Sequence, residues 1–179
     1  MIRAALRSNH FGVLERAVLA VGFVTGLRRS ELVALTWDDV AEEPHGGFIL
    51  TIRRSKTDQA GESQVVAVPA TGDATTCPAT LLRRLIRCSG CTGRVFPVCE
   101  RTVSTLVKRA AELSGFAVSD FSAHSLRSGL ATTAGHAGVS LGEIMGATRH
   151  KSAQVAAGYM RASEQAKNLA HLAAARSLG

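Results

Sequence analysis

The sequence predicts a mainly α-helical protein with one small antiparallel β-sheet, an α+β fold. Apolar residues recur with helical spacing through most of the 179 residues, and 46% of the chain is hydrophobic against 20% charged, a balance typical of globular proteins. In residues 48–53, by contrast, Phe48, Leu50 and Ile52 alternate with the residues between them, and residues 63–68 form a second β-rich run. No internal repeat or long linker divides the sequence, so we expect residues 1–179 to form a single domain.

Two helices are expected ahead of the sheet. Dense apolar residues predict a buried helix over residues 11–24, with Gly26 as its stop. A second helix begins near Arg28, and the apolar residues of SELVALTW give it a core-facing side. Arg28 and Glu31 are three residues apart and therefore face the same way on that helix. Core packing is expected to position this pair.

These two β-rich runs are expected to form a hairpin. Residues 58–61, with the sequence DQAG, are typical of a turn between the two strands. Lys56 would then lie near the tip of the hairpin.

Helical spacing returns after the hairpin. CPATLLRRLIRC predicts a helix with Pro78 in its first turn, where proline is tolerated. TVSTLVKRAAELSG predicts another core helix. The apolar stripe of this second helix consists of Val103, Leu106, Val107, Ala110 and Leu113.

The last third of the chain is expected to be helical as well. A helix is predicted over residues 122–134, and SLGEIMGA begins with Ser140 and Glu143 at the spacing of a capping box. Further helical segments are expected after Ser152 and over residues 164–177.

The charge balance favours a phosphate-rich partner. The chain has 21 Lys and Arg against 14 Asp and Glu, a net charge of +7, and 17 of the basic residues are Arg. Arginine presents a planar fork of donors that suits phosphate oxygens. No apolar run approaches the roughly 20 residues that a membrane span needs, and the first residues lack the apolar core of a signal peptide. We therefore expect a cytoplasmic protein with no membrane partner.

The four cysteines lie between Cys77 and Cys99, and Cys88 and Cys91 have a spacing used by zinc sites. A closed zinc site would require Cys77 and Cys99 to converge on this pair. We expect reduced structural thiols and no bound metal, with a small zinc-binding module as the alternative.

Two pairs of polar residues are candidates for a site. His124 and Arg127 are three apart on a predicted helix and can contact one ligand, although a solvated helix face would show the same pattern. His150 and Tyr159 are nine apart, which would place them on opposite sides of one continuous helix. A helix break between them, with a new helix starting at Lys151–Ser152, would allow them to converge.

Four segments together resemble the tyrosine recombinase (phage integrase) family, in order and at suitable separations. They are TGLRRSELVALTWDDV, IRRSKTDQAG, AHSLRSGLATTAGHAG and VSLGEIMGATRHKSAQVAAGYMR. The resemblance runs from about Phe11 to about Ser177, and it implies the fold of that family's catalytic domain.

The resemblance also implies a set of catalytic residues. Arg28, and not Arg29, corresponds to the first arginine of the family, because it stands two residues after Gly26 and three before Glu31. Glu31 would be a supporting acid. The six catalytic positions are filled by Arg28, Lys56, His124, Arg127, His150 and Tyr159.

These residue types suit the breaking of a phosphodiester bond. Arg28 and Arg127 would clamp the scissile phosphate, so no metal is required. Tyr159, the only tyrosine, would be the nucleophile; because its ordinary pKa is about 10, it needs help, for which His124 is the candidate. Lys56 would protonate the leaving 5′ oxygen by the family's pattern.

The implied activity is that of a site-specific DNA recombinase or integrase that works through a 3′-phosphotyrosyl intermediate, without a cofactor. His150 would donate a further hydrogen bond to the phosphate. The implied partner is double-stranded DNA, and residues 164–177 would dock on another copy of the chain or pack in cis. Strand nicking and resealing like that of a type IB topoisomerase, and a non-catalytic DNA-binding remnant of the fold, are the alternatives.

One departure from the family concerns the start of the chain. Family members usually carry a helical DNA-binding domain before the catalytic one, whereas only about 25 residues precede Arg28. We therefore expect that domain to be absent from this chain, either because this is an excised catalytic domain or because the gene product is naturally short.

Overall fold

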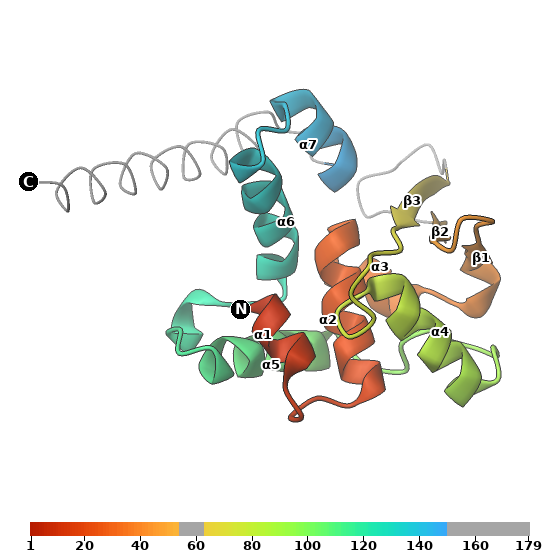
Figure 1. The fold of residues 1–179 in the computed structure, drawn as a ribbon, viewed down its shortest axis with the longest axis horizontal. Coiled ribbons are helices and arrows are strands. Elements are labelled where there is room, and N and C mark those ends of the chain that lie inside the picture. The colour runs from red at the N-terminus through yellow and green to blue at the C-terminus, as the bar shows by residue number, and fades with distance from the viewer. Residues whose placement is uncertain (54–62, 150–179) are drawn as a thin grey trace, which may run out of the picture. The chain divides into compact units, whose positions relative to one another are not determined.

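The computed structural model describes residues 1–53 and 63–149, and the chain divides into two compact units, Met1–Arg127 and Ser128–Gly179. Over the described residues of the first unit, the chain forms five helices, two short 3-10 turns and one sheet before α6 begins (Figure 1).

Helix α2 (Val13–Thr25) is the centre of the first unit. α1 (Ile2–Arg7), α4 (Pro78–Ser89) and α5 (Glu100–Leu113) all pack against it (Figure 1). This role explains why α2 is apolar on nearly all sides, since a helix covered by neighbours has no wet face to keep polar. The predicted buried helix is confirmed.

The turn after α2 is made by Gly26, which adopts the left-handed conformation at φ 57° and ψ 25°. Glycine takes this conformation without the steric cost that a Cβ would impose, which is why it commonly ends helices. Leu27 then enters the core, and α3 (Arg29–Ala34) begins two residues later. The predicted stop at Gly26 is therefore confirmed.

The sheet has three antiparallel strands in the order β1 (Val40–Glu42), β2 (Phe48–Ile52) and β3 (Gln64–Val68). The 3-10 turn η1 (Trp37–Asp39) leads into β1. In β2 buried and half-buried residues alternate, because one face lies on the core and the other does not. The predicted pair of strands is confirmed, whereas β1 was not predicted, since its three residues are too few to show alternation.

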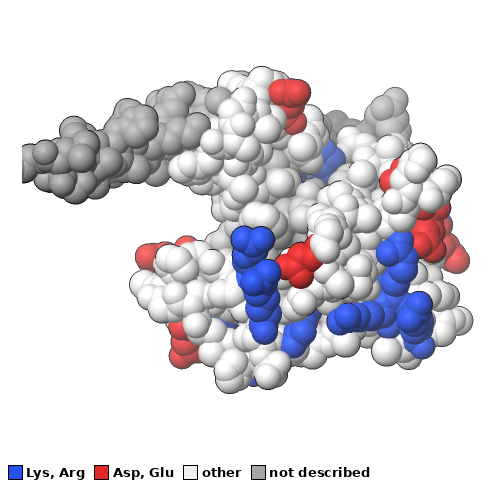
Figure 2. All heavy atoms as spheres, in the orientation of Figure 1, with Lys and Arg blue, Asp and Glu red and all other residues white. Residues whose placement is uncertain are grey.

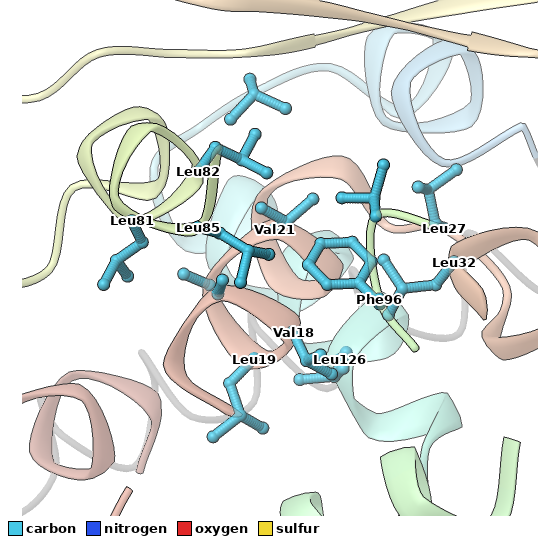
Figure 3. Packing of buried hydrophobic residues seen from close by; sticks show 14 of the residues in the cluster. Val18, Leu19, Val21, Leu27, Leu32, Leu81, Leu82, Leu85, Phe96 and Leu126 are labelled. Carbon is cyan, nitrogen blue, oxygen red and sulfur yellow. The ribbon is translucent and has the colours of Figure 1, made fainter. Parts of the chain in front are cut away.

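One apolar core joins these elements. Figure 3 shows side chains of α2, α3 and α4 meeting Phe96 and Leu126, both of which are buried. The labelled residues of this cluster are Val18, Leu19, Val21, Leu27, Leu32, Leu81, Leu82, Leu85, Phe96 and Leu126.

Helices α4 and α5 largely follow the predicted pattern. Pro78 is the first residue of α4, and the stripe of α5 is buried up to Ala110. The prediction is wrong at Leu113, which is 43% exposed, because this residue ends α5 and the chain turns at Ser114. The 3-10 turn η2 (Val118–Asp120) follows.

Helix α6 (His124–His136) starts in the first unit and continues into the second. The second unit then forms α7 (Leu141–Thr148), where Ser140 accepts a hydrogen bond from the Glu143 amide and the Glu143 carboxylate accepts from Ser140, as a capping box does. Arg149 ends α7 in the left-handed conformation, with φ 53° and ψ 41°.

Three expected segments lie outside the described residues: the tip of the hairpin, the helix after Ser152 and the helix over residues 164–177. Helix α1 was not predicted, because its six residues hold too few apolar positions to show a period. Across residues 1–53 and 63–149, no helix combines the length and the apolar character that a membrane crossing requires.

Side chains of neighbouring elements pack closely against Gly22 of α2. A Cβ there would lie 2.8 Å from Cδ1 of Leu126 and 3.3 Å from Cδ2 of Leu32. We expect Gly22→Ala to lower the free energy of unfolding, because forcing a methyl group into a packed core costs about 1–3 kcal/mol, while alanine returns only about 1 kcal/mol of helix propensity. Urea unfolding followed by circular dichroism measures this change.

Gly142→Ala in α7 is the matched control, since no heavy atom of the described residues lies within 4 Å of its added Cβ. We expect that variant to be neutral or stabilising. Equal effects of the two substitutions would show that the crossing at Gly22 is not tight.

Candidate active site

Arg28 is fixed at the start of α3 by Glu31. Its backbone N–H donates to Oε2 of Glu31 at 2.8 Å, and its Nη1 donates to Oε1 at 2.7 Å. Glu31 is only 5% exposed, so a buried carboxylate holds both the backbone and the side chain of Arg28. A carboxylate near a helix N-terminus is also favoured by the helix dipole. These two contacts are the kind that the supporting role predicted for Glu31 would need.

Arg127 reaches the same turn from α6. It is 3% exposed, and its Nη1 donates to the carbonyl oxygen of Gly26 at 2.8 Å. A cation is stabilised at the C-terminal end of a helix, where carbonyl groups lack intrahelical partners. Arg127 is therefore bound at the end of α2 by Gly26, which stands two residues before Arg28 in the sequence.

A hollow of about 460 Å³ opens beside this turn. Arg28 and Arg127 line it together with His124, the first residue of α6. Three cationic or titratable side chains from two distant parts of the sequence thus surround one space. The hollow is wide enough and basic enough to receive a phosphate group.

The pKa of His124 is lowered from its ordinary value of 6.5 by burial, then by the positive charges of Arg127 and Arg28. Each of these causes disfavours the imidazolium form. His124 is therefore neutral at physiological pH, and a neutral imidazole has one nitrogen that accepts a proton and one that donates a hydrogen bond.

Two residues that the sequence did not single out also line the hollow. Nε of Arg29 lies 2.7 Å from Oε2 of Glu100, and this ion pair joins the starts of α3 and α5. Arg29 directly follows Arg28, a predicted catalytic residue, and this position could have pointed to it. Glu100 has no such signal, because it stands 71 positions after Arg29 in the sequence.

Lys56, His150 and Tyr159 lie outside the described residues. What the structure adds is the end of α7: the helix stops at Thr148, and Arg149 caps it in the left-handed conformation. The expected helix break between His150 and Tyr159 lies outside the described residues as well.

The strand that leads toward Lys56 is tied down at its end. Asp39 accepts hydrogen bonds from the amide and hydroxyl of Thr36, at 2.9 and 2.7 Å, and from Nε of Arg53, which directly follows β2. Burial raises the pKa of Asp39, but these hydrogen bonds outweigh it and hold that pKa below its usual value. The base of the hairpin is thus fixed by an ion pair.

The cysteines do not gather into one cluster. Cys77 is buried at the start of α4, whereas Cys88, Cys91 and Cys99 are exposed. Burial raises the pKa of the Cys77 thiol, but hydrogen bonds from Thr71 and Thr80 lower it to about 7. Within the described parts of the chain, no three His, Cys, Asp or Glu side chains lie together as a metal site would need.

Residues 1–166 match the phage integrase family. The chain belongs to this family. An integrase/recombinase XerD homolog of Selenomonas ruminantium is 30% identical over 162 residues, which are 83% of this chain and 47% of that protein. The integrase-family chain therefore spans about half the length of this relative.

Solved structures of recombinases and of an integrase share the fold. XerH bound to its palindromic difH substrate after cleavage has a TM-score of 0.74 at 17% identity, over 95% of this chain and 49% of that one. XerA recombinase has a TM-score of 0.71 at 16% identity, over 95% and 60%. A lambda integrase dimer bound to a COC′ core site has a TM-score of 0.62 at 24% identity, over 89% and 55%. The expected tyrosine recombinase catalytic-domain fold is confirmed.

Replacing Glu31 tests its hold on Arg28. We expect Glu31→Ala to lower the free energy of unfolding by about 1–3 kcal/mol, because it removes the partner of a partly buried guanidinium and of the Arg28 amide. Glu31→Gln keeps an oxygen that can accept from either donor and should lose less. Chemical denaturation compares the two, and equal losses would show that the carboxylate charge alone matters.

The proton affinity of His124 gives a second prediction. We expect its titration midpoint, followed by NMR of the imidazole protons, to lie below 6.5 in the folded protein. Arg28→Gln should raise that midpoint, because it removes one of the charges that disfavour the imidazolium. Arg87→Gln, on the exposed last turn of α4, is the control and should leave it unchanged. A midpoint that does not respond to Arg28→Gln would contradict the electrostatic cause.

Proposed function

We propose that this integrase-family chain is the catalytic part of a site-specific DNA recombinase or integrase, which cleaves and rejoins DNA strands through a 3′-phosphotyrosyl intermediate. The observation that carries the proposal is the convergence of Arg28, His124 and Arg127 on one hollow, with Arg127 buried at the end of α2. Burying an arginine is costly unless the site uses it or pairs it well. Here the buried arginine faces the space where a phosphate would bind.

The two arginines would stabilise the charge that develops on the phosphate. Arg28 is oriented by Glu31 and Arg127 by the Gly26 carbonyl, so both are positioned before DNA arrives. Donors that are already oriented need no reorganisation when negative charge builds on the non-bridging oxygens. This role resembles that of metal ions in other phosphoryl-transfer enzymes.

The remaining steps rest on residues assigned from the sequence. The Tyr159 oxygen would attack the phosphorus and form a phosphotyrosyl bond, with neutral His124 assisting the loss of the phenolic proton. The bond from phosphorus to the 5′ oxygen would break, with Lys56 supplying the proton to that oxygen. His150 would hydrogen-bond the phosphate. Attack by a 5′ hydroxyl reverses these bond changes and rejoins a strand without ATP.

Double-stranded DNA is the proposed partner, in agreement with the cytoplasmic location expected from the sequence. Three structures with this fold are XerH bound to difH, lambda integrase bound to a COC′ core site and the Tn1549 integrase in complex with transposon right end DNA. We also propose a homo-oligomer on DNA, in which residues 164–177 dock on a neighbouring copy. The lambda integrase structure is that of a dimer.

Only part of the basic charge is available for DNA. Figure 2 shows Lys and Arg side chains over the area of α1, α2 and α4, with acidic side chains among them. Several arginines are paired within the first unit: Arg7 with Asp73, Arg53 with Asp39, Arg83 with Glu42, and Arg109 with Glu15. For the proposed DNA-binding site, the hollow is therefore a stronger argument than the net charge of +7.

Trapping the covalent intermediate tests the proposed activity. We expect the protein to form an adduct with a pool of nicked duplexes of random sequence, because a nick next to the cleavage point lets the 5′ end diffuse away and prevents rejoining. The adduct should persist on a denaturing gel. Tyr159→Phe should form none, since it lacks the attacking oxygen.

The outcomes separate the candidate functions. DNA binding without any adduct would contradict the recombinase and indicate a non-catalytic remnant. An adduct that also forms with Tyr159→Phe would overturn the assignment of the nucleophile. An adduct accompanied by relaxation of supercoiled plasmid, with no exchange between two DNA molecules, would indicate topoisomerase-like nicking and resealing.

A further inference from the structure

We propose that Arg29 binds a DNA backbone phosphate next to the scissile one, and that Glu100 positions the Arg29 side chain for this contact. The proposal rests on the proposed function of the same hollow. It adds one residue that would contact the substrate and one positioning residue, neither of which the family resemblance identified.

The first observation is the place of Arg29 beside Arg28. Both side chains line the hollow, but the side chain of Arg28 is 27% exposed and that of Arg29 is 57% exposed. Two successive arginines therefore reach different depths of one space. A phosphate bound deep between Arg28 and Arg127 would leave Arg29 at the rim, where the DNA backbone continues on either side of the scissile group.

The second observation is the geometry of the Arg29 contact. Oε2 of Glu100 lies 2.7 Å from Nε of Arg29, so the ion pair is made at one edge of the guanidinium. The two terminal nitrogens, Nη1 and Nη2, are not part of that ion pair, and arginine can use them to bind phosphate oxygens as a pair. One guanidinium can thus hold Glu100 and a phosphate at the same time.

The third observation is that Glu100 has a fixed position. It is the first residue of α5, a 14-residue helix whose inner face is buried in the core. If Glu100 holds the Arg29 side chain in one rotamer, that side chain loses less conformational entropy when it binds a phosphate. A carboxylate at the rim of a phosphate site also repels DNA, so its presence there is better explained by what it does to Arg29 than by direct contact with DNA.

A purely structural pair is the competing explanation. An exposed ion pair between α3 and α5 would contribute at most about 1 kcal/mol to folding and would play no part in DNA binding. The two explanations differ in how DNA affinity responds to salt, because each phosphate contact releases counterions from DNA.

The first test replaces Arg29. The affinity of the Tyr159→Phe protein for a short duplex of arbitrary sequence is measured over a range of salt concentrations, with and without Arg29→Gln. We expect Arg29→Gln to weaken binding by roughly three- to tenfold and to reduce the slope of log K against log salt by about 1. Arg87→Gln removes the same charge from the exposed last turn of α4, outside the hollow, and is the matched control. An unchanged slope, or a slope equal to that of the control, would overturn the proposal.

The second test separates positioning by Glu100 from its charge. Glu100→Gln and Glu100→Ala remove the same negative charge, but only glutamine keeps an oxygen that can accept from Nε of Arg29. We expect the glutamine variant to bind the duplex several-fold more tightly than the alanine variant. Equal affinities would show that Glu100 does not position Arg29.

These outcomes are distinct from a failure of the proposed function. If the wild-type protein forms no covalent adduct but Arg29→Gln still changes the salt slope, the recombinase proposal fails and the phosphate contact stands. If the adduct forms and the slope does not change, the reverse holds.

Discussion

The hydrogen bond from Arg127 to the carbonyl of Gly26 is the interaction on which the described site depends. It joins residues 101 positions apart, and it does so inside the protein, where an unsatisfied guanidinium would be costly. Because Gly26 ends α2 and Leu27 leads directly into Arg28, the same bond sets the distance between the start of α6 and the start of α3. His124, three residues before Arg127, is carried to the hollow by the same helix.

Much of the first unit could be predicted from local sequence. The apolar period of α2, the alternation in β2 and the proline at the start of α4 are local signals, and each reports its element. α1 and β1 were not predicted, because short elements are stabilised by tertiary contacts and show no clear sequence pattern of their own. The exposure of Leu113 was not predicted for a related reason. A helical stripe shows which side of a helix faces inward, but not where along the helix the core ends.

The site was less predictable than the fold. The spacing of Arg28 and Glu31 was enough to pair them, because both stand on one helix. That Arg127 would be 3% exposed and bound to a backbone carbonyl could not be read from its neighbours, nor could the approach of Glu100 to Arg29. Contacts of this kind depend on how distant elements meet. The resemblance to the family suggested roles for Arg28 and Arg127 without their geometry.

The crossing at Gly22 has a consequence for how this protein can diverge. A larger residue at position 22 fits only if position 126 or position 32 becomes smaller, because the space above the glycine is already filled by two leucines. Leu126 adjoins Arg127 on α6, the helix that also carries His124. A substitution that relieves crowding at position 22 therefore alters the packing of the helix that brings both side chains to the hollow.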